Sequence, residues 1–204
     1  MQKSDVQDQI IDAAEKRFSD YGFKKTIMAE IAADCPMSVG NLYRFFKNKE
    51  SMAAALVNRC LEDKIQQGVD AAANEQGCLN QLNAFLLARL AYAHAHIKDH
   101  RHLHELVMIV HKNHADILEC MEKKTTAIMA EFLDQGQLSG EFKKVDSERT
   151  AYLLHHSLMR YNYPLSLKNN SLTMLQKDLS DFLEMVYTGL RPCDTFVPLK
   201  LLKK

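Results

Sequence analysis

The chain has 204 residues, of which 47% are hydrophobic and 25% charged, a composition of globular proteins that excludes disordered and fibrous classes. It carries 26 basic and 26 acidic residues, so the zero formal charge neither favours nor excludes a nucleic-acid partner. The five scattered cysteines without a C-x-x-C pair, the lack of a signal peptide and the lack of a long apolar run predict a cytoplasmic protein without a membrane span.

Helical periodicity runs along almost the whole chain. Only seven glycines and four prolines interrupt apolar residues that recur three and four positions apart, and no useful period-2 strand pattern occurs. The pattern predicts an all-α fold of about nine helices. We expect an N-terminal helix-turn-helix domain over residues 1–50 and a second helical domain over residues 51–204.

The first two predicted helices have recognisable ends. A capping box of Ser4 and Gln7 opens a helix over about residues 5–20, and Gly22 supplies the left-handed residue that stops it. Thr26 is a good N-cap for a short second helix, which should turn Ile27, Ile31 and Ala32 toward the core.

A tight turn then leads to a third short helix, from Ser38 to about Phe46, and Asn48 caps a long fourth helix to about Ala72. Two short helices joined by such a turn form a helix-turn-helix, whose second helix fits the major groove of DNA. No acidic residue occurs from Cys35 to Lys49, while Arg44, Lys47 and Lys49 are basic. This local patch indicates a DNA-binding surface.

The expected base contacts lie on the third helix. Asn41 can pair with adenine, Arg44 can reach a guanine or a phosphate, and the methyl groups of Val39 can touch a thymine methyl. Helix N-termini at residues 26 and 49 are suited to phosphates. The predicted DNA-binding residues are Thr26, Ser38, Val39, Gly40, Asn41, Tyr43, Arg44 and Lys49. The alternative is that S-V-G-N-L-Y-R-F-F is only an aromatic-rich core helix.

Further helices are predicted over about residues 79–96, 99–112, 115–135, 147–161 and 173–189. Asp146 or Ser147 should cap the fourth of these, and Pro164 should end it. The last helix should bury one broad stripe formed by Leu175, Leu179, Phe182, Leu183, Val186 and Leu190.

The N-terminal motifs resemble those of a known family. The runs A-E-K-R-F-S-D-Y-G-F, T-I-M-A-E-I-A and M-S-V-G-N-L-Y-R-F-F-K-N-K-E over residues 8–56 resemble the N-terminal domain of TetR-family transcriptional repressors. The resemblance implies a homodimer paired through its last two helices, about residues 147–162 and 173–190. It also implies a palindromic DNA operator and release of that DNA by a small-molecule inducer in the C-terminal domain.

One residue departs from the family pattern. Pro36 stands where the family usually has glycine in the turn between the second and third helices, and proline cannot take a positive φ. The turn should therefore differ in detail.

Bulky apolar and polar-tipped side chains in the C-terminal half are typical of an adaptable ligand cavity. The candidate ligand-binding residues are Phe85, Arg89, Tyr92, Leu103, Met108, Met121, Met129, Met159 and Tyr163. No cofactor is expected.

All nine histidines lie between His94 and His156, seven of them from His94 to His114. If one continuous helix carried them, four could share a face and form a metal or haem sensor: His96, His100, His104 and His111. The alternative is a set of polar histidines around a helix–helix junction. A helical-bundle metalloenzyme would need repeated Glu-x-x-His or H-E-x-x-H motifs. Neither occurs, so we expect no enzyme.

Overall fold

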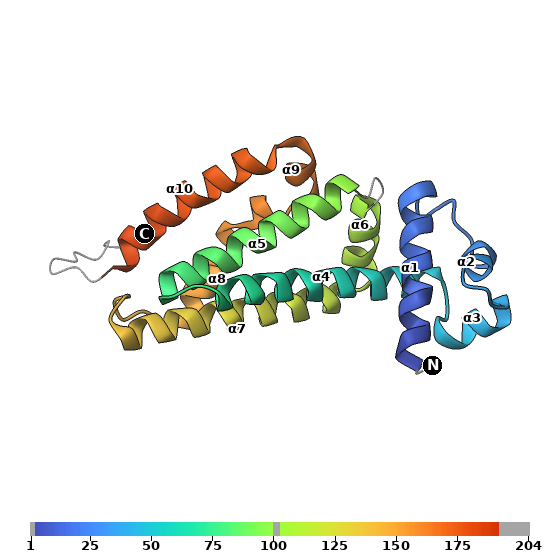
Figure 1. Cartoon of the computed structure of the whole chain (residues 1–204), viewed down its shortest axis with the longest axis horizontal. Coiled ribbons are helices and arrows are strands. Elements are labelled where there is room, and N and C mark those ends of the chain that lie inside the picture. The colour runs from blue at the N-terminus through green and yellow to red at the C-terminus, as the bar shows by residue number, and fades with distance from the viewer. Residues whose placement is uncertain (1–2, 100–102, 192–204) are drawn as a thin grey trace, which may run out of the picture.

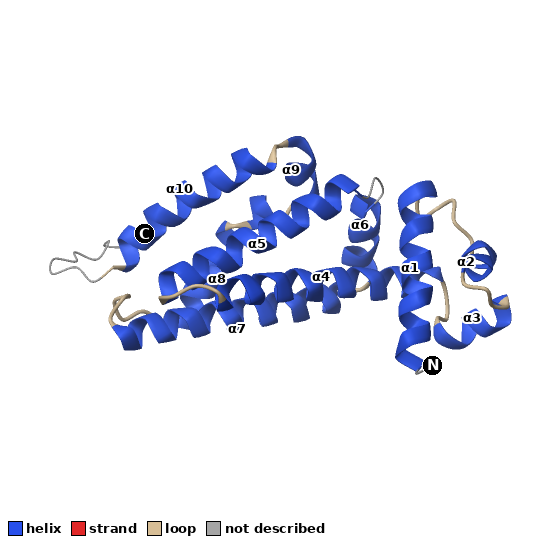
Figure 2. Ribbon diagram, in the orientation of Figure 1, coloured by secondary structure: helices blue, strands red, loops and turns tan. Residues whose placement is uncertain are grey.

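The computed structural model describes residues 3–99 and 103–191. Within these ranges the chain forms ten α-helices and one 3-10 turn, with no strand (Figure 2). Their bounds are α1 Lys3–Tyr21, α2 Met28–Asp34, α3 Val39–Phe45, α4 Lys49–Ala73, α5 Cys78–Asp99, α6 Leu103–Asn113, α7 Ala115–Ser139, α8 Ser147–Ser157, η1 Met159–Tyr161, α9 Pro164–Asn169 and α10 Leu172–Leu190. The all-α prediction is confirmed.

The molecule is elongated, with a head of three helices at one end (Figure 1). We call residues 3–48 the head and residues 49–191 the body. Helix α1 crosses the N-terminal end of α4, and α2 and α3 lie beyond α1, at the tip. Helices α4, α5 and α7 run along the body, and α10 packs against α5.

Two hydrophobic cores divide the buried side chains. The body core joins α4, α5 and α7 to α8, α9 and α10. The head core contains α1, α2 and α3, together with Met52, Leu56 and Val57 of α4 and Leu106 and Val110 of α6. Because each fully buried Leu or Phe contributes roughly 1.5–3 kcal/mol, these shared side chains fix the head to the body. The boundary at residue 50 stays a prediction, since α4 crosses it without a break.

Several predicted helix ends are found in the structure. Gly22 has a φ of 86°, and its N–H donates to the Phe18 carbonyl over 3.0 Å. Ser38, Asn48 and Asp146 cap α3, α4 and α8. At the start of α5, the Glu141 carboxylate accepts the N–H groups of Cys78 and Leu79, each over 3.2 Å, a long-range cap that the sequence pattern did not indicate.

The predicted start of α2 is wrong by one residue. Ile27, not Thr26, occupies the N-cap position, and its N–H donates to the Glu30 carboxylate over 2.9 Å. Thr26 is instead fully buried, and its hydroxyl donates to the carbonyls of Gly22 and Arg17 over 3.0 and 3.3 Å. The loop after Gly22 therefore takes Thr26 into its interior and leaves Ile27 outside, 57% exposed.

The role predicted for Pro164 is also wrong. Helix α8 already ends at Ser157, and Pro164 begins α9, a helix that was not predicted. Proline suits the first turn of a helix because its φ is preset and its missing N–H has no intrahelical partner there. The stripe on α10 is confirmed for its leucines, which are buried, while Phe182 and Val186 pack at the edge of the body core.

In the described ranges, no helix combines the length and the apolar character needed to cross a membrane.

Candidate nucleic-acid interface and cavity

Helix α3 has one buried and one exposed side. The Asn41 N–H donates to the Ser38 hydroxyl over 3.2 Å, which fixes the first turn. Leu42 is completely buried in the head core, whereas Val39 and Tyr43 are 37% and 52% exposed. Such an exposed side on a braced short helix is the geometry with which helix-turn-helix proteins approach the major groove.

The other predicted contact residues occupy the same surface. Ser38, Gly40 and Arg44 are exposed and Asn41 is half-buried. A Cβ placed on Gly40 would meet no atom within 4 Å, so this position is open for a close approach of the helix to another surface. The individual DNA contacts stay predictions.

The turn between α2 and α3 closes without a left-handed residue. Cys35 has a φ of −102°, and the Met37 N–H donates to the Ala32 carbonyl over 3.3 Å. No non-glycine residue of the described ranges has a positive φ. Pro36 is thus accommodated by a turn that does not need the conformational freedom of glycine.

Lys49 and Thr26 make hydrogen bonds inside the head rather than at its surface. The Lys49 ammonium donates to the carbonyls of Phe23 and Thr26 over 2.5 and 2.8 Å and lies 4.4 Å from the centre of the Phe23 ring. Desolvation lowers the pKa of Lys49. These bonds make Lys49 a staple between α4 and the loop after α1. The Thr26 hydroxyl, expected at the phosphate surface, is buried, so it is not available there.

Ion pairs connect the head to the body, and another ion pair connects two helices of the head. Arg59 of α4 contacts two carboxylates of α1, Asp12 over 2.7 Å and Glu15 over 2.9 Å. Within the head, the Arg17 guanidinium binds both oxygens of Asp34 and thereby ties α1 to α2. The orientation of the head is therefore linked to α4 by directional bonds as well as by apolar packing.

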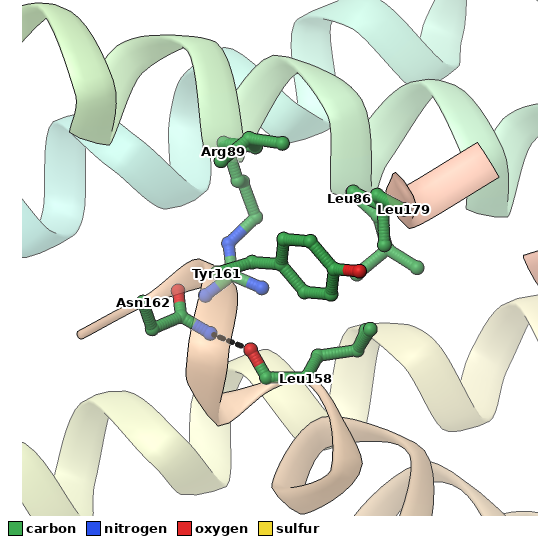
Figure 3. Close-up of a pocket in the computed structure, with 7 residues that line it drawn as sticks. Leu86, Arg89, Leu158, Tyr161, Asn162 and Leu179 are labelled. Carbon is green, nitrogen blue, oxygen red and sulfur yellow. Dashed lines mark hydrogen bonds between the residues drawn. The ribbon is translucent and has the colours of Figure 1, made fainter. Parts of the chain in front are cut away.

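A cavity of about 100 Å³ lies in the body beside this junction. Its walls come from α4, α5, α6 and the segment around α9: Val57, Cys60, Leu61, Lys64, Tyr92, Ala93, His96, Ile97, Val107, Asn162, Pro164 and Leu167. A smaller hollow adjoins it at Asn162, which lines both. Figure 3 shows Arg89 pointing into this hollow beside Tyr161 and Asn162.

Three basic side chains are buried in this part of the body: Lys64 and Arg89 line the two spaces, and the charges of both act on His155. Lys64 and Arg89 are 8% and 7% exposed, and His155 is 9% exposed. Desolvation, with the nearby Arg89 charge, lowers the pKa of Lys64 to about 7, and desolvation lowers that of Arg89 to about 10. Desolvation and the neighbouring positive charges lower the pKa of His155 to about 4. The interior is therefore unfavourable to uncompensated positive charge.

The candidate ligand residues fall into different environments. Tyr92 lines the cavity and Arg89 the adjoining hollow. Phe85, Met121 and Met129 are buried, whereas Met108, Met159 and Tyr163 are about half exposed. The Leu103 side chain lies outside the described residues. Sequence analysis missed Lys64 and Asn162, although a lysine among Leu61, Ile65 and Gly68 was a detectable signal of a polar group on an apolar helix face.

The histidine face proposed for a metal or haem sensor stays a prediction. His96 lies on α5 and His111 on α6. His96 is half-buried and His111 exposed, while His100 and the His104 side chain lie outside the described residues.

A different cluster does bring three metal-binding residue types together. Glu15, Cys60 and His96 place their ligand atoms within 4.8 Å of one another, where α1, α4 and α5 meet. Arg59 binds Glu15, and the Tyr92 hydroxyl lies 3.3 Å from the His96 ring. Burial and Glu15 raise the pKa of Cys60 to about 12, which keeps the thiol protonated. The three side chains therefore belong to the place where the head and the body meet.

The fold and the exposed α3 define a helix-turn-helix regulator with a helical body. Residues 10–56 match the model of the family described as bacterial regulatory proteins, tetR family, and residues 79–182 match that of the tetracyclin repressor-like C-terminal domain. The chain belongs to the TetR family of transcriptional regulators. Its members are regulators, so the function of the chain is regulation and not catalysis.

Individual relatives agree with this assignment. The uncharacterized HTH-type transcriptional regulator YhgD of Bacillus subtilis is 26% identical over 153 residues, which cover 71% of this chain and 76% of YhgD. A transcriptional regulator from Cytophaga hutchinsonii has a similar structure, with a TM-score of 0.70, 21% identity and coverage of 91% of this chain and 98% of that one.

A second solved structure, of FadR from Bacillus subtilis in complex with stearoyl-CoA, has a TM-score of 0.65 at 19% identity and covers 90% of this chain and 98% of FadR. These likenesses show the fold. None of the relatives supports a metal- or haem-responsive sensor.

Proposed function

We propose that the chain is a ligand-responsive repressor, which binds a palindromic operator as a homodimer and is released by a small molecule bound in the body. The observation that carries this proposal is the position of the cavity. Cys60, Tyr92 and His96 belong both to its wall and to the junction between head and body. A ligand in the cavity therefore touches the residues that set the orientation of the head.

The path from cavity to DNA is short. Arg59 precedes Cys60 on α4 and binds α1, while Val57, another wall residue, also belongs to the head core. A shift of α4 or α5 around a ligand thus moves α1, and α3 with it. A ligand that binds one arrangement more tightly than the other changes DNA affinity by that difference.

Exposed apolar side chains on α8, η1 and α10 support the proposal that these helices form the dimer interface. Tyr152, Leu153 and Met159 on α8 and η1 are 42–50% exposed, and Met185 on α10 is 65% exposed. We propose that these helices, within residues 147–162 and 173–190, pair with the same helices of a second copy. Two-fold symmetry then sets two α3 helices about 34–36 Å, or a multiple of that, apart on DNA.

Selection of bound fragments from a random DNA pool tests this function. The proposal predicts one enriched inverted repeat that binds two chains, and a protein that sediments as a dimer at micromolar concentration. Met185→Glu should reduce both dimer and operator binding, whereas Leu138→Glu, at an 89% exposed position on α7, should leave both intact. A monomer that binds all fragments equally would contradict the proposal.

A further inference from the structure

Two buried basic side chains of the body, Lys64 and Arg89, have no acidic partner in the described ranges. Lys64 donates to the Asn162 side-chain oxygen over 2.5 Å, and Arg89 donates to the Thr125 hydroxyl over 3.2 Å. The Nε of Arg89 is buried without any hydrogen-bond partner. We propose that this pair binds the anion of a small organic carboxylate, whose apolar chain fills the adjoining cavity. This inference rests on the proposed ligand-responsive function and names the ligand's chemical class.

The geometry brings both cations to one place. Asn162 accepts from Lys64 and lines the cavity that Lys64 also lines, and it lines the hollow into which Arg89 points (Figure 3). Arg89 is also close enough for its charge to lower the pKa of Lys64. A carboxylate beside Asn162 has two oxygens, one for the ammonium and one for the guanidinium edge that ends in the unpaired Nε.

Burial without a counterion destabilises the unliganded protein. Taking an unpaired charge out of water costs several kcal/mol, and replacement of buried charges by apolar groups is often neutral or stabilising. Arg89 also lies over the Phe85 ring, 5.0 Å from its centre, but a methionine could keep such apolar contacts at lower cost. Such a strained charged pair beside a cavity is the arrangement expected of a binding site that only its ligand completes.

The rest of the cavity determines what is attached to the anion. Apart from Lys64 and the polar groups of Cys60, Tyr92, His96 and Asn162, its wall is apolar, with Val57, Leu61, Ile97, Val107 and Leu167. Its volume is about 100 Å³. Because a cavity of about 150 Å³ holds the six carbons of benzene, a chain of about four carbons fits. Inorganic phosphate would leave these apolar walls unfilled.

The test is a comparison of carboxylates with neutral compounds of the same shape. Butanoate, hexanoate and octanoate, and the matching alcohols 1-butanol, 1-hexanol and 1-octanol, are titrated into the full chain at pH 7 by calorimetry and by thermal unfolding. We expect hexanoate or butanoate to bind and to raise the unfolding midpoint, and the alcohols to bind at least tenfold more weakly. Equal binding of acids and alcohols, or no binding of any acid, would overturn the inference.

Variants separate recognition of the anion from a structural role. Lys64→Met and Arg89→Met should each weaken carboxylate binding at least tenfold while leaving the unliganded protein equally or more stable. Lys124→Met is the matched control, since Lys124 is an exposed lysine paired with Glu62 of α4 and should change neither quantity. Carboxylate binding that survives in both cavity variants would contradict the assignment, whatever their stability.

DNA release distinguishes this inference from the proposed function. If a neutral compound displaces operator DNA and no carboxylate does, the chain is ligand-responsive but the anion site is wrong. If the acids bind the cavity and leave DNA affinity unchanged, the anion site stands and the ligand-responsive function fails.

Discussion

Lys49 illustrates at the scale of one residue how contacts change an interpretation made from sequence. Its position at a helix N-terminus predicts a phosphate contact, yet its ammonium is held by two backbone carbonyls of the head. Sequence could indicate a lysine at this point but not its partners, because they lie 26 and 23 positions earlier in the chain.

The first prediction concerns this staple. Lys49→Met should lower the free energy of unfolding by about 1–3 kcal/mol, since it removes charge-assisted bonds and leaves buried carbonyls without a donor. Urea unfolding measures the change, and Lys47→Met, at an exposed position, is the control. Unchanged stability combined with weaker binding to all DNA would instead support a pure phosphate contact.

His155 makes the free energy of unfolding depend on pH. Its folded-state pKa of about 4 lies below the usual 6.5, so the folded protein holds a neutral ring while the unfolded chain takes up a proton first. The free energy of unfolding is therefore not reduced by this residue above pH 6.5. It falls by up to about 3 kcal/mol as the pH is lowered toward 4, because the unfolded chain then binds a proton that the folded protein does not.

Replacement of this histidine gives the second prediction. His155→Gln should flatten the decline in unfolding free energy between pH 6.5 and 4.5, as measured by urea unfolding at several pH values. His111→Gln, at an exposed position on α6, is the control and should keep the wild-type slope. Identical slopes for the wild-type protein and His155→Gln would show that the buried ring does not cause the loss of stability in acid.

Individual helices were predictable to the extent that their ends depend on local residues. Gly22, Ser38 and Asn48 act within one turn of their own helix, and all three ends are as predicted. The start of α9 at Pro164 depends instead on where the preceding segment turns, and sequence alone suggested a stop. Proline is compatible with both outcomes, because it ends one helix and can begin another.

Gly136 inside α7 gives an element-scale prediction. A Cβ at this position would lie 2.1 Å from the Phe142 ring, which folds back over the helix end. Gly136→Ala should therefore destabilise the protein by about 1–3 kcal/mol, although alanine is the better helix former. Gly189→Ala in α10, where a Cβ meets nothing, should be neutral or stabilising. Thermal unfolding of both variants checks the contrast, and equal effects would contradict it.

At the scale of the whole molecule, the site depends on residues far apart in the chain. Lys64 and Asn162 are separated by 98 positions, so no spacing could associate them. The exposed residues of α3 belong to one short segment, which is why that surface was predictable and the cavity was not.

Arg59 should transmit the state of the cavity to the head. Arg59→Ala removes both bonds to α1, so the ligand should still bind but should change operator affinity by a smaller factor. Lys123→Ala, which removes an exposed pair with Glu119 on α7, is the control. Fluorescence anisotropy of labelled operator with and without ligand measures the factor. The same factor in Arg59→Ala and wild type would place the coupling elsewhere.

The most direct test of the central claim is the ratio of affinities for the selected operator and for a scrambled duplex, measured by anisotropy at one salt concentration. A regulator that reads DNA with α3 should prefer its operator at least about 1,000-fold. Asn41→Ala should reduce the preference by about 1–3 kcal/mol at one base position, and Arg44→Ala should weaken operator binding, while both proteins remain folded. Equal affinity for the two duplexes, or a preference unaffected by either substitution, would contradict the account.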